Sequence, residues 1–407
     1  MPSRVYLDHA ATSPLRPQVH AVLTELRERA AGNPSSLHGT GRAARRIVEE
    51  AREQVADAVG AAATEVVFTS GGTEADNLAV TGIARARRSA DPRRRRVLVS
   101  AVEHHAVLDT AHALAGEGFS IVELPVDGSG RLDVAALSAA LNDPGALNDP
   151  GALDESIALV SVMAANNEVG TVQPLGEVVA LCEAAGIPVH CDAVQALGVL
   201  DLDFAASGLA AMSITGHKAG GPVGTGALLL RHDVPVRAVL HGGGQQRGIR
   251  SGTLDAVGAA AFAAAASLAV AGRVEHVAHL SQLRARLIDG AHACVPDVCV
   301  AGAVRPAAVL PGVAWLRFPD ADADAVLFAL DSSGIDVSTG SACSAGVARG
   351  SHVLAAMSQL PDGSPDGIRV SLGWSSTPAD VDALLTALPE AVAMGRAAAA
   401  ADRAAFA

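Results

Sequence analysis

The sequence predicts an α/β protein with a large domain built on a mostly parallel sheet and a smaller α+β domain. Over the first two-thirds of the chain, apolar runs typical of buried strands alternate with helical patterns. After residue 255 this alternation gives way to an Ala-rich helical stretch and then to further strand-like and helical segments. Alternation of this kind implies right-handed crossovers between parallel strands, whose carboxyl ends gather ligands.

The individual elements follow from the same patterns. In the first part, strands are expected at 65–69, 96–100, 157–163, 187–191 and 211–214, and a helix at 73–86. In the second part, helices are expected at 256–271 and 323–331, and a strand at 313–318. We assign residues 14–255 to the large domain, and residues 1–13 and 256–407 to the small one. The segment Leu141–Ala152 contains one six-letter sequence twice, and its Asp-Pro-Gly chemistry predicts a surface loop without a catalytic role.

The composition limits the classes of function. Hydrophobic residues make up 50% of the chain and aromatic residues only 2%, so small aliphatic side chains must fill the core. The formal net charge of -13 argues against a nucleic-acid-binding surface. The one basic run, Arg93 to Arg96, is interpreted as a solvated loop before a strand.

Cysteine usage and the N-terminal residues indicate a cytoplasmic protein with reduced thiols. The N-terminus lacks a signal-peptide pattern, and no apolar segment of spanning length is found, so no membrane partner is expected. Five cysteines do not make a disulfide framework, and the lack of a CxxC pair makes a zinc site unexpected. Four of the five lie in apolar or strand-like surroundings and are predicted to be buried: Cys182, Cys191, Cys294 and Cys299.

Lys218 is the strongest candidate for chemistry. It ends the motif SITGHK at 213–218, after a buried strand and before a Gly-rich loop. Schiff-base chemistry needs an amine whose pKa is depressed by its surroundings, which lysine tolerates. Taken alone, Lys218 is better interpreted as a surface lysine, and it is the neighbouring motifs that favour the catalytic interpretation.

A phosphate cup is offered by the motif TSGGTEADN at 69–77, where a strand and a glycine turn lead into a helix. The free N–H groups and the dipole of a helix N-terminus bind phosphate. An ordinary capping box of Thr73 and Asp76 is the alternative, and the segment can serve both purposes.

Further polar residues follow other predicted strands. Asp192 is either a helix cap or a carboxylate opposite a pyridinium nitrogen, where it would keep the ring protonated. Gln195 and Asn167 could bond a phenolic oxygen, and His104 could stack on the ring or serve as a structural hydrogen-bonding residue. Cys343 lies in a run of Gly, Ser and Ala, which indicates an accessible nucleophile on a mobile loop.

These motifs, taken together, resemble those of the cysteine desulfurases of class-V aminotransferase fold, in particular the NifS/IscS-like group with a long catalytic loop. The resemblance covers nearly the whole chain. It is based on YLDHAAT (6–12), GNPSS (32–36), the cup, EH (103–104), NNEVG (166–170), DAVQ (192–195), GHK (216–218), GGGQQRGIRSGT (242–253), the cysteine loop and IRVSLG (368–373).

The resemblance implies a fold-type I pyridoxal-phosphate enzyme and a role for each matching residue. Lys218 would carry pyridoxal 5'-phosphate as a Schiff base, and Cys343 would be the nucleophile. The phosphate would be held by Gly72, Thr73, Thr215 and His217, and by Thr253 reaching into the partner subunit of a homodimer. The ring would contact Asp192, Gln195, Asn167 and His104, which would also relay a proton. Arg369, together with Asn167, would bind the substrate carboxylate.

The activity that the resemblance implies is conversion of L-cysteine to L-alanine, with the sulfur held as an enzyme persulfide. The persulfide would pass to an acceptor protein, either an iron–sulfur scaffold or a tRNA thiolase. No metal site is expected, although a transient iron–sulfur ligand role for Cys343 stays open. Two departures from the family pattern are Thr215, where serine is usual, and Gln246, where glutamate is common. The alternatives are a selenocysteine lyase or aminotransferase of the same fold, and a sulfur-transfer scaffold without turnover.

Overall fold

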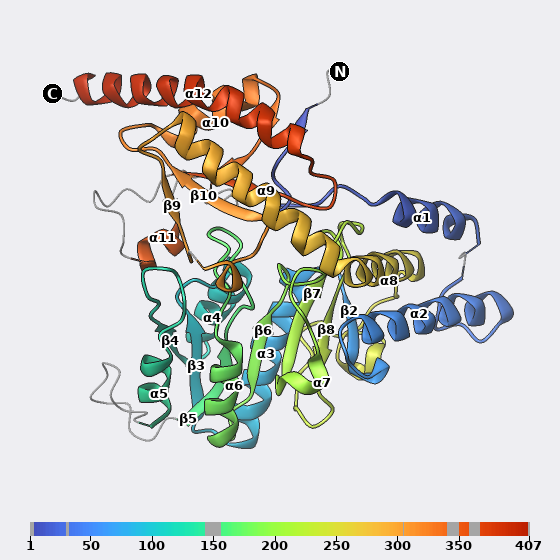
Figure 1. The fold of residues 1–407 in the computed structure, drawn as a ribbon. Coiled ribbons are helices and arrows are strands. Elements are labelled where there is room, and N and C mark those ends of the chain that lie inside the picture. Colours follow the sequence, from blue (N-terminus) through green and yellow to red (C-terminus); the bar gives the residue numbers. More distant parts are fainter. Residues whose placement is uncertain are drawn as a thin grey trace.

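The computed structural model describes residues 4–29, 32–142, 156–303, 305–339, 350–357 and 367–405. A large α/β unit carries a smaller α+β unit on one side, and the long helix α9 (Arg273–Cys294) crosses between them (Figure 1). The N-terminal strand β1 (Val5–Tyr6) pairs with β11 (Ile335–Asp336) of the small unit. The chain then enters the large unit, so both units contribute to the region between them.

The large unit is built on a seven-stranded sheet in the order β2-β8-β7-β6-β5-β3-β4. Its strands are β2 (Val66–Thr69), β3 (Arg94–Ser100), β4 (Ser120–Leu124), β5 (Ser156–Ser161), β6 (Val189–Asp192), β7 (Ala211–Thr215) and β8 (Gly226–Leu230). Only β8 runs against its neighbours, so the other six share one direction. The predicted α/β fold with a mostly parallel sheet is confirmed.

Helices cover both faces of this sheet because successive strand side chains point to opposite faces. On one face, Val97, Val99 and Leu159 pack against α3 (Gly72–Ala90) and α4 (His105–Ala115). On the other, Leu98, Val160 and Met212 join a core that the remaining helices complete. These helices are α2 (Gly39–Ala58), α5 (Val134–Asn142), α6 (Leu175–Ala184), α7 (Phe204–Ser207) and α8 (Ala256–Ala271). Helix α1 (Pro17–Arg29) packs on α8 at the edge of the molecule.

The small unit has a four-stranded antiparallel sheet in the order β12-β13-β10-β9. The strands are β9 (Cys299–Ala301), β10 (Val313–Arg317), β12 (Ser338–Thr339) and β13 (Ile368–Ser371). Helices α9, α10 (Ala323–Ser332) and α12 (Pro378–Ala405) enclose its own hydrophobic core, and the short α11 (His352–Met357) faces the large unit. The predicted domain boundary at residue 255 stays a prediction. In the described chain, the change from the first core to the second falls at Gly272, between α8 and α9.

Two local predictions were wrong. Strand β3 begins at Arg94, and Arg96 is only 3% exposed, so most of the basic run belongs to the sheet and not to a solvated loop. Cys182 and Cys191 are buried as expected, whereas Cys294 is only partly buried and Cys299 is exposed. Cys299 opens the edge strand β9, where one strand face has no covering layer.

No single helix among the described residues is both long and apolar enough to cross a membrane. The pair α8 and α9 passes the length and composition test only when taken together, across a bend of 71°.

The packing of α8 against the segment after β6 can be tested at Gly198. This residue has a φ of 75°, and a Cβ placed on it would lie 2.5 Å from the Cβ of Ala269 in α8. We expect Gly198→Ala to lower the free energy of unfolding by about 3 kcal/mol, because backbone strain and overpacking add. Chemical denaturation measures this loss.

Gly186 provides the matched control. It has a φ of 65°, but a Cβ there would meet nothing within 4 Å. Gly186→Ala should therefore cost only the backbone strain, about 1 kcal/mol. Equal losses for the two variants would show that the contact with α8 is not a tight one.

Candidate active site

The carboxyl ends of β2, β3, β5, β6 and β7 meet at one edge of the sheet, directly below the small unit. A pocket of about 860 Å³, its open mouth included, lies there. Most of the predicted site residues line it: Gly72, Thr73, His104, Asn167, Asp192, Gln195, His217, Lys218 and Arg369. Residues that are far apart in the sequence are thus brought together by the direction of the strands.

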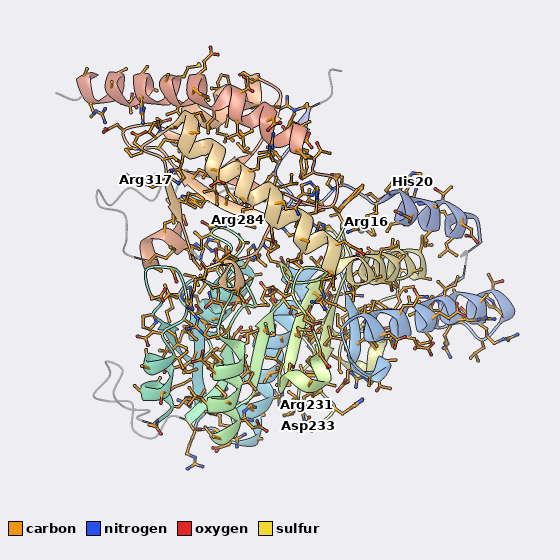
Figure 2. All side chains as sticks on the ribbon, viewed as in Figure 1. Arg16, His20, Arg231, Asp233, Arg284 and Arg317 are labelled. Carbon is orange, nitrogen blue, oxygen red and sulfur yellow. The ribbon has the colours of Figure 1, made fainter. Side chains whose placement is uncertain are left out.

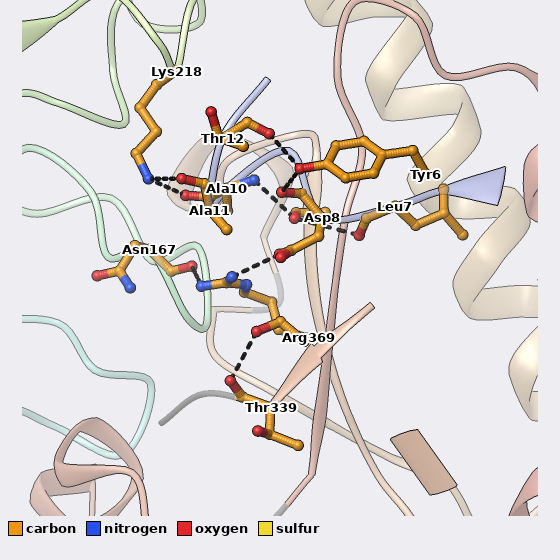
Figure 3. Close-up of polar contacts among 12 residues, drawn as sticks. Tyr6, Leu7, Asp8, Ala10, Ala11, Thr12, Asn167, Lys218, Thr339 and Arg369 are labelled. Atoms are coloured by element: carbon orange, nitrogen blue, oxygen red, sulfur yellow. Dashed lines mark hydrogen bonds and ion pairs between the residues drawn. The ribbon is translucent and has the colours of Figure 1, made fainter. Parts of the chain in front are cut away.

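Lys218 enters the pocket from the turn that follows β7, and its amine contacts the N-terminal segment (Figure 3). The Nζ atom donates hydrogen bonds to the carbonyl oxygens of Ala10, at 2.5 Å, and Ala11, at 2.7 Å. The Gln195 side chain donates to the same Ala10 oxygen at 2.9 Å. The N-terminal segment therefore holds the amine and the Gln195 amide on one side of the pocket.

The turn after Lys218 is anchored by Arg16, which lies between α1 and the body of the molecule (Figure 2). Its backbone N–H donates to Gly220 O and its Nε to Ala219 O, both at 2.9 Å. Its guanidinium also lies 5.4 Å from the centre of the Trp374 ring. These contacts fix the backbone next to Lys218 from the N-terminal side.

The N-terminus of α3 forms the cup that the sequence predicts. Gly71 is the N-cap with a φ of 148°, and no side chain caps the helix. A Cβ on Gly72 would lie 2.6 Å from a methyl group of Val194, so a larger residue would fill the space in front of the helix. The predicted capping box of Thr73 and Asp76 was wrong, because α3 begins one residue before Thr73 and Asp76 is buried below the pocket.

Asp192 ends strand β6 and lines the pocket. It is 5% exposed, and its Oδ1 accepts a hydrogen bond from the Val194 N–H at 2.9 Å. Burial raises the pKa of Asp192, while the Val194 N–H and the charge of Lys218 oppose this shift. Both interpretations of Asp192 therefore hold. Its side chain caps the turn that follows β6, and it also lines the pocket.

Two further buried acids surround Asp192. Asp76 is 1% exposed and its Oδ1 lies 3.6 Å from His190 Nε2, and Glu103 is fully buried with one oxygen that accepts from the Met163 N–H at 2.6 Å. Burial and the charge of Asp192 raise the pKa values of both. Three neighbouring buried carboxyls cannot all be ionised cheaply, which is why the pKa values of all three are raised.

The two predicted histidines are neutral at pH 7. Burial and the charge of Lys218 lower the pKa of His104 to about 4, and the same two causes lower the pKa of His217 to about 4. His104 caps α4, with its Nδ1 accepting from the Ala106 N–H at 3.1 Å, so the neutral ring carries its proton on Nε2. His217 Nδ1 lies 3.2 Å from the Thr12 hydroxyl.

Arg369 closes the pocket from the small unit. Its side chain is 3% exposed and pairs with Asp8 Oδ1 at 2.8 Å, while Nη1 donates to Asn167 O at 3.2 Å (Figure 3). Its backbone lies in β13 between Trp315 of β10 and Ser338 of β12. A planar guanidinium held in this way can bind a carboxylate with two parallel hydrogen bonds.

Three predicted residues are not part of this pocket lining. Thr215 is buried beneath the cup, where its hydroxyl donates to Thr225 O at 2.9 Å. Thr253 lies on the exposed loop after β8, outside the pocket of its own chain. Cys343 falls outside the described residues. Thr339, the last described residue before it, pairs with Ile368 next to Arg369.

A family model described as aminotransferase class-V matches residues 5–384. The chain belongs to the class-V aminotransferase family. It is 50% identical over 395 residues to an IscS-like cysteine desulfurase of Mycobacterium tuberculosis, covering 97% of this chain and 98% of that protein. A solved NifS-like protein shares 33% identity and a TM-score of 0.85, with 96% and 99% of the two chains covered. The structure of SspA in complex with cysteine matches with 27% identity and a TM-score of 0.73, over 90% of this chain and 98% of that one. The predicted resemblance to the cysteine desulfurases of this family is confirmed.

Several residues at the site have no role that the sequence predicts. Asp8, Ala10 and Ala11 belong to the motif at 6–12. Asp8 contacts Arg369, and the carbonyl oxygens of Ala10 and Ala11 contact Lys218, so these pairs join residues that are far apart in the sequence and in different units. Asp76 was interpreted only as a capping residue, because its burial follows from the packing of α3 under the sheet. Within the described chain, no group of three or more His, Cys, Asp or Glu side chains is placed to hold a metal ion.

Gln246, which departs from the family pattern, has a defined contact. Its side-chain amide donates to Phe68 O at 2.7 Å and accepts from Phe68 N at 2.8 Å. An ionised glutamate could accept from Phe68 N but could not donate to Phe68 O. Arg250 of the same loop forms two hydrogen bonds with Glu74, whose other contact is with Ser70 N of the cup. The loop at 242–253 is thus fixed to the cup of its own chain.

Glu168, next to Asn167, provides a pH test of the site. It is 4% exposed, and burial raises its pKa to about 7 against hydrogen bonding by Ser351 and the charge of Arg369. A folded-state pKa above the unfolded value makes an acid less favourable for folding as the pH rises. We therefore expect the free energy of unfolding to fall by about 3 kcal/mol between pH 4.5 and 7 on account of this group.

Glu168→Gln should remove this component, because glutamine mimics the protonated acid at every pH. Denaturant unfolding from pH 5 to pH 8 would then show a difference between variant and wild type that grows with pH and levels off above about pH 7. If the unfolding free energies of variant and wild type changed in parallel with pH, Glu168 would have the same pKa in the folded and the unfolded state.

Proposed function

We propose that this chain is a pyridoxal-phosphate-dependent cysteine desulfurase that converts L-cysteine to L-alanine and keeps the sulfur on Cys343. The observation that supports it best is the single pocket that joins Lys218, Asp192, His104 and Arg369 to the N-terminus of α3. The relatives named as cysteine desulfurases match this chain over nearly its whole length.

The residues of the pocket fit pyridoxal phosphate. Gly71 and Gly72 leave the first N–H groups of α3 open at a place that a Cβ would fill, as a phosphate requires. Asp192, a buried acid at the end of β6, lines the same pocket and would supply the carboxylate that the pyridine nitrogen needs. Lys218 lines the same pocket and is the only lysine in the sequence.

When bound, pyridoxal phosphate supplies a ring that accepts electron density from the Cα atom of an amino acid. Lys218 would hold the cofactor aldehyde between turnovers and, once released by substrate, would take the Cα proton on Nζ. The neutral His104 would stack on the ring, and its Nε2–H could donate a proton. Arg369 would bind the substrate carboxylate and so orient Cα towards Lys218.

The sulfur step uses Cys343 as a thiolate, since the thiol is a poor nucleophile. Its sulfur attacks the sulfur of the substrate, so an S–S bond forms while the carbon–sulfur bond of cysteine breaks. The bonding electrons stay with the substrate carbon, which takes up a proton and leaves as L-alanine. Cysteine and one enzyme thiol thereby give alanine and one enzyme persulfide.

The partners proposed for this chain are a second copy of itself and a sulfur acceptor. Thr253 lies outside the pocket of its own chain, and in a homodimer it would reach the phosphate of the partner subunit. The acceptor would be a protein of iron–sulfur cluster assembly or of tRNA thiolation. The cytoplasmic location stays a prediction.

The covalent role of Lys218 can be tested by chemical trapping. Borohydride reduction of the protein with bound pyridoxal phosphate should add a phosphopyridoxyl group that peptide mapping assigns to residue 218. Because no other lysine is present, the only competing amine is the N-terminus. Lys218→Ala should show no labelled internal peptide, and a label that persists in this variant, or an unlabelled Lys218 in the wild type, would contradict the proposal.

The role of Cys343 is tested with L-cysteine and a thiol reductant. We expect Cys343→Ala to lower alanine formation by at least about 1,000-fold while cofactor binding persists. Cys299→Ser is the control, since Cys299 is an exposed thiol that lies on the edge strand β9 of the small unit, outside the pocket lining. If Cys299→Ser and Cys343→Ala were equally active, the nucleophile would lie elsewhere.

A further inference from the structure

Arg369 has an internal counter-ion at the place where a substrate carboxylate would bind. Its Nη2 donates to Asp8 Oδ1 at 2.8 Å, and this ion pair lies at the end of the N-terminal segment that also contacts Lys218 (Figure 3). The sequence motif that contains Asp8 predicted no role for this carboxylate.

The two partners of this pair differ in their access to water. The Arg369 side chain is 3% exposed, whereas that of Asp8 is 19% exposed. A buried guanidinium without a counter-ion is costly, while a carboxylate at the pocket edge can turn towards solvent and regain its hydration. If a second carboxylate arrives, Asp8 is the partner that can leave.

The backbone of Arg369 cannot easily move away. It lies in the interior strand β13, paired with Trp315 on one side and Ser338 on the other. Its Nη1 is also held by the Asn167 carbonyl oxygen at 3.2 Å. Competition for Arg369 is therefore a competition between two carboxylates for one fixed guanidinium.

We propose that Asp8 occupies Arg369 in place of the substrate carboxylate and thereby sets the affinity of the site for its substrate. This inference rests on the proposed function, in which Arg369 receives the carboxylate of cysteine. A substrate must displace Asp8 or share Arg369 with it, so the ion pair weakens binding of every carboxylate. Rapid release of the product alanine, which carries the same carboxylate, is the benefit for turnover.

The acid next to Asn167 adds to this effect. The carboxyl group of Glu168 interacts electrostatically with Arg369. Its Oε2 also accepts a hydrogen bond from the Ser351 hydroxyl. Among the charged groups that face Arg369, Asp8 is the one in direct contact. Removing the charge at residue 8 should thus change carboxylate binding more than removing the charge of Glu168.

The test uses propionate, which has the carboxylate of alanine but no amine that could react with the cofactor. Binding to the cofactor-loaded protein is measured by the rise of the unfolding midpoint with ligand concentration. We expect Asp8→Asn to bind propionate about tenfold more tightly than wild type, a difference of about 1.4 kcal/mol. The KM for L-cysteine should fall in the same variant. Propionamide, the uncharged analogue, should bind both proteins alike.

Matched variants separate this effect from a general disturbance. Asp336→Asn removes a carboxylate that pairs with Arg4 on the exposed side of the N-terminal strand, and it should leave propionate binding within about twofold of wild type. Asp8→Glu retains the charge and should bind propionate as weakly as wild type. If Asp8→Asn folds poorly, Asp8→Ser tests the same loss of charge with a smaller side chain.

The outcomes distinguish this inference from the function on which it rests. Tighter propionate binding in Asp8→Asn alone supports the competition. Unchanged or weaker binding overturns it, and the proposed function stands if the wild type still forms alanine from cysteine. If Arg369→Lys binds propionate as the wild type does, the carboxylate binds elsewhere, and both this inference and the role of Arg369 fall.

Discussion

The shared direction of five strands is the constraint on which the candidate site depends. Parallel strands place their carboxyl ends at one edge, and each of β2, β3, β5, β6 and β7 ends there in a turn that carries a polar residue into the pocket. Among the described lining residues, the small unit contributes Arg369, through the interior strand β13. A guanidinium from one unit and an amine from the other are joined by the N-terminal segment, which bonds to both. The distance between the two therefore depends on how the units pack.

Much of the fold and of the site could be predicted from the sequence because both are encoded locally. Buried strands appear as short apolar runs, and Lys218 and Asp192 directly follow two of them. The errors arose where the answer depends on distant parts of the chain. Arg96 is buried because neighbouring strands flank β3, and Cys299 is exposed because β9 is an edge strand; neither fact is visible in a window of a few residues. The partnership of Asp8 with Arg369 joins residues from opposite ends of the chain.

The electrostatics of the pocket show a division of work between buried groups. Asp76 and Glu103 neighbour Asp192, and burial together with the charge of Asp192 raises the pKa of both, which opposes further negative charge beside Asp192. Neutral His104 and His217 also line the pocket, so the only cations among the described lining residues are Lys218 and Arg369.

The contact of Gln246 with Phe68 has a consequence beyond the site. Strand β2 is at one border of the seven-stranded sheet, where an unpaired backbone invites another chain to add a strand. The Gln246 amide supplies both a donor and an acceptor to that border, in the manner of one residue of a further strand. The backbone N–H and C=O of Phe68 are therefore paired within the chain and are not open to a strand from another molecule.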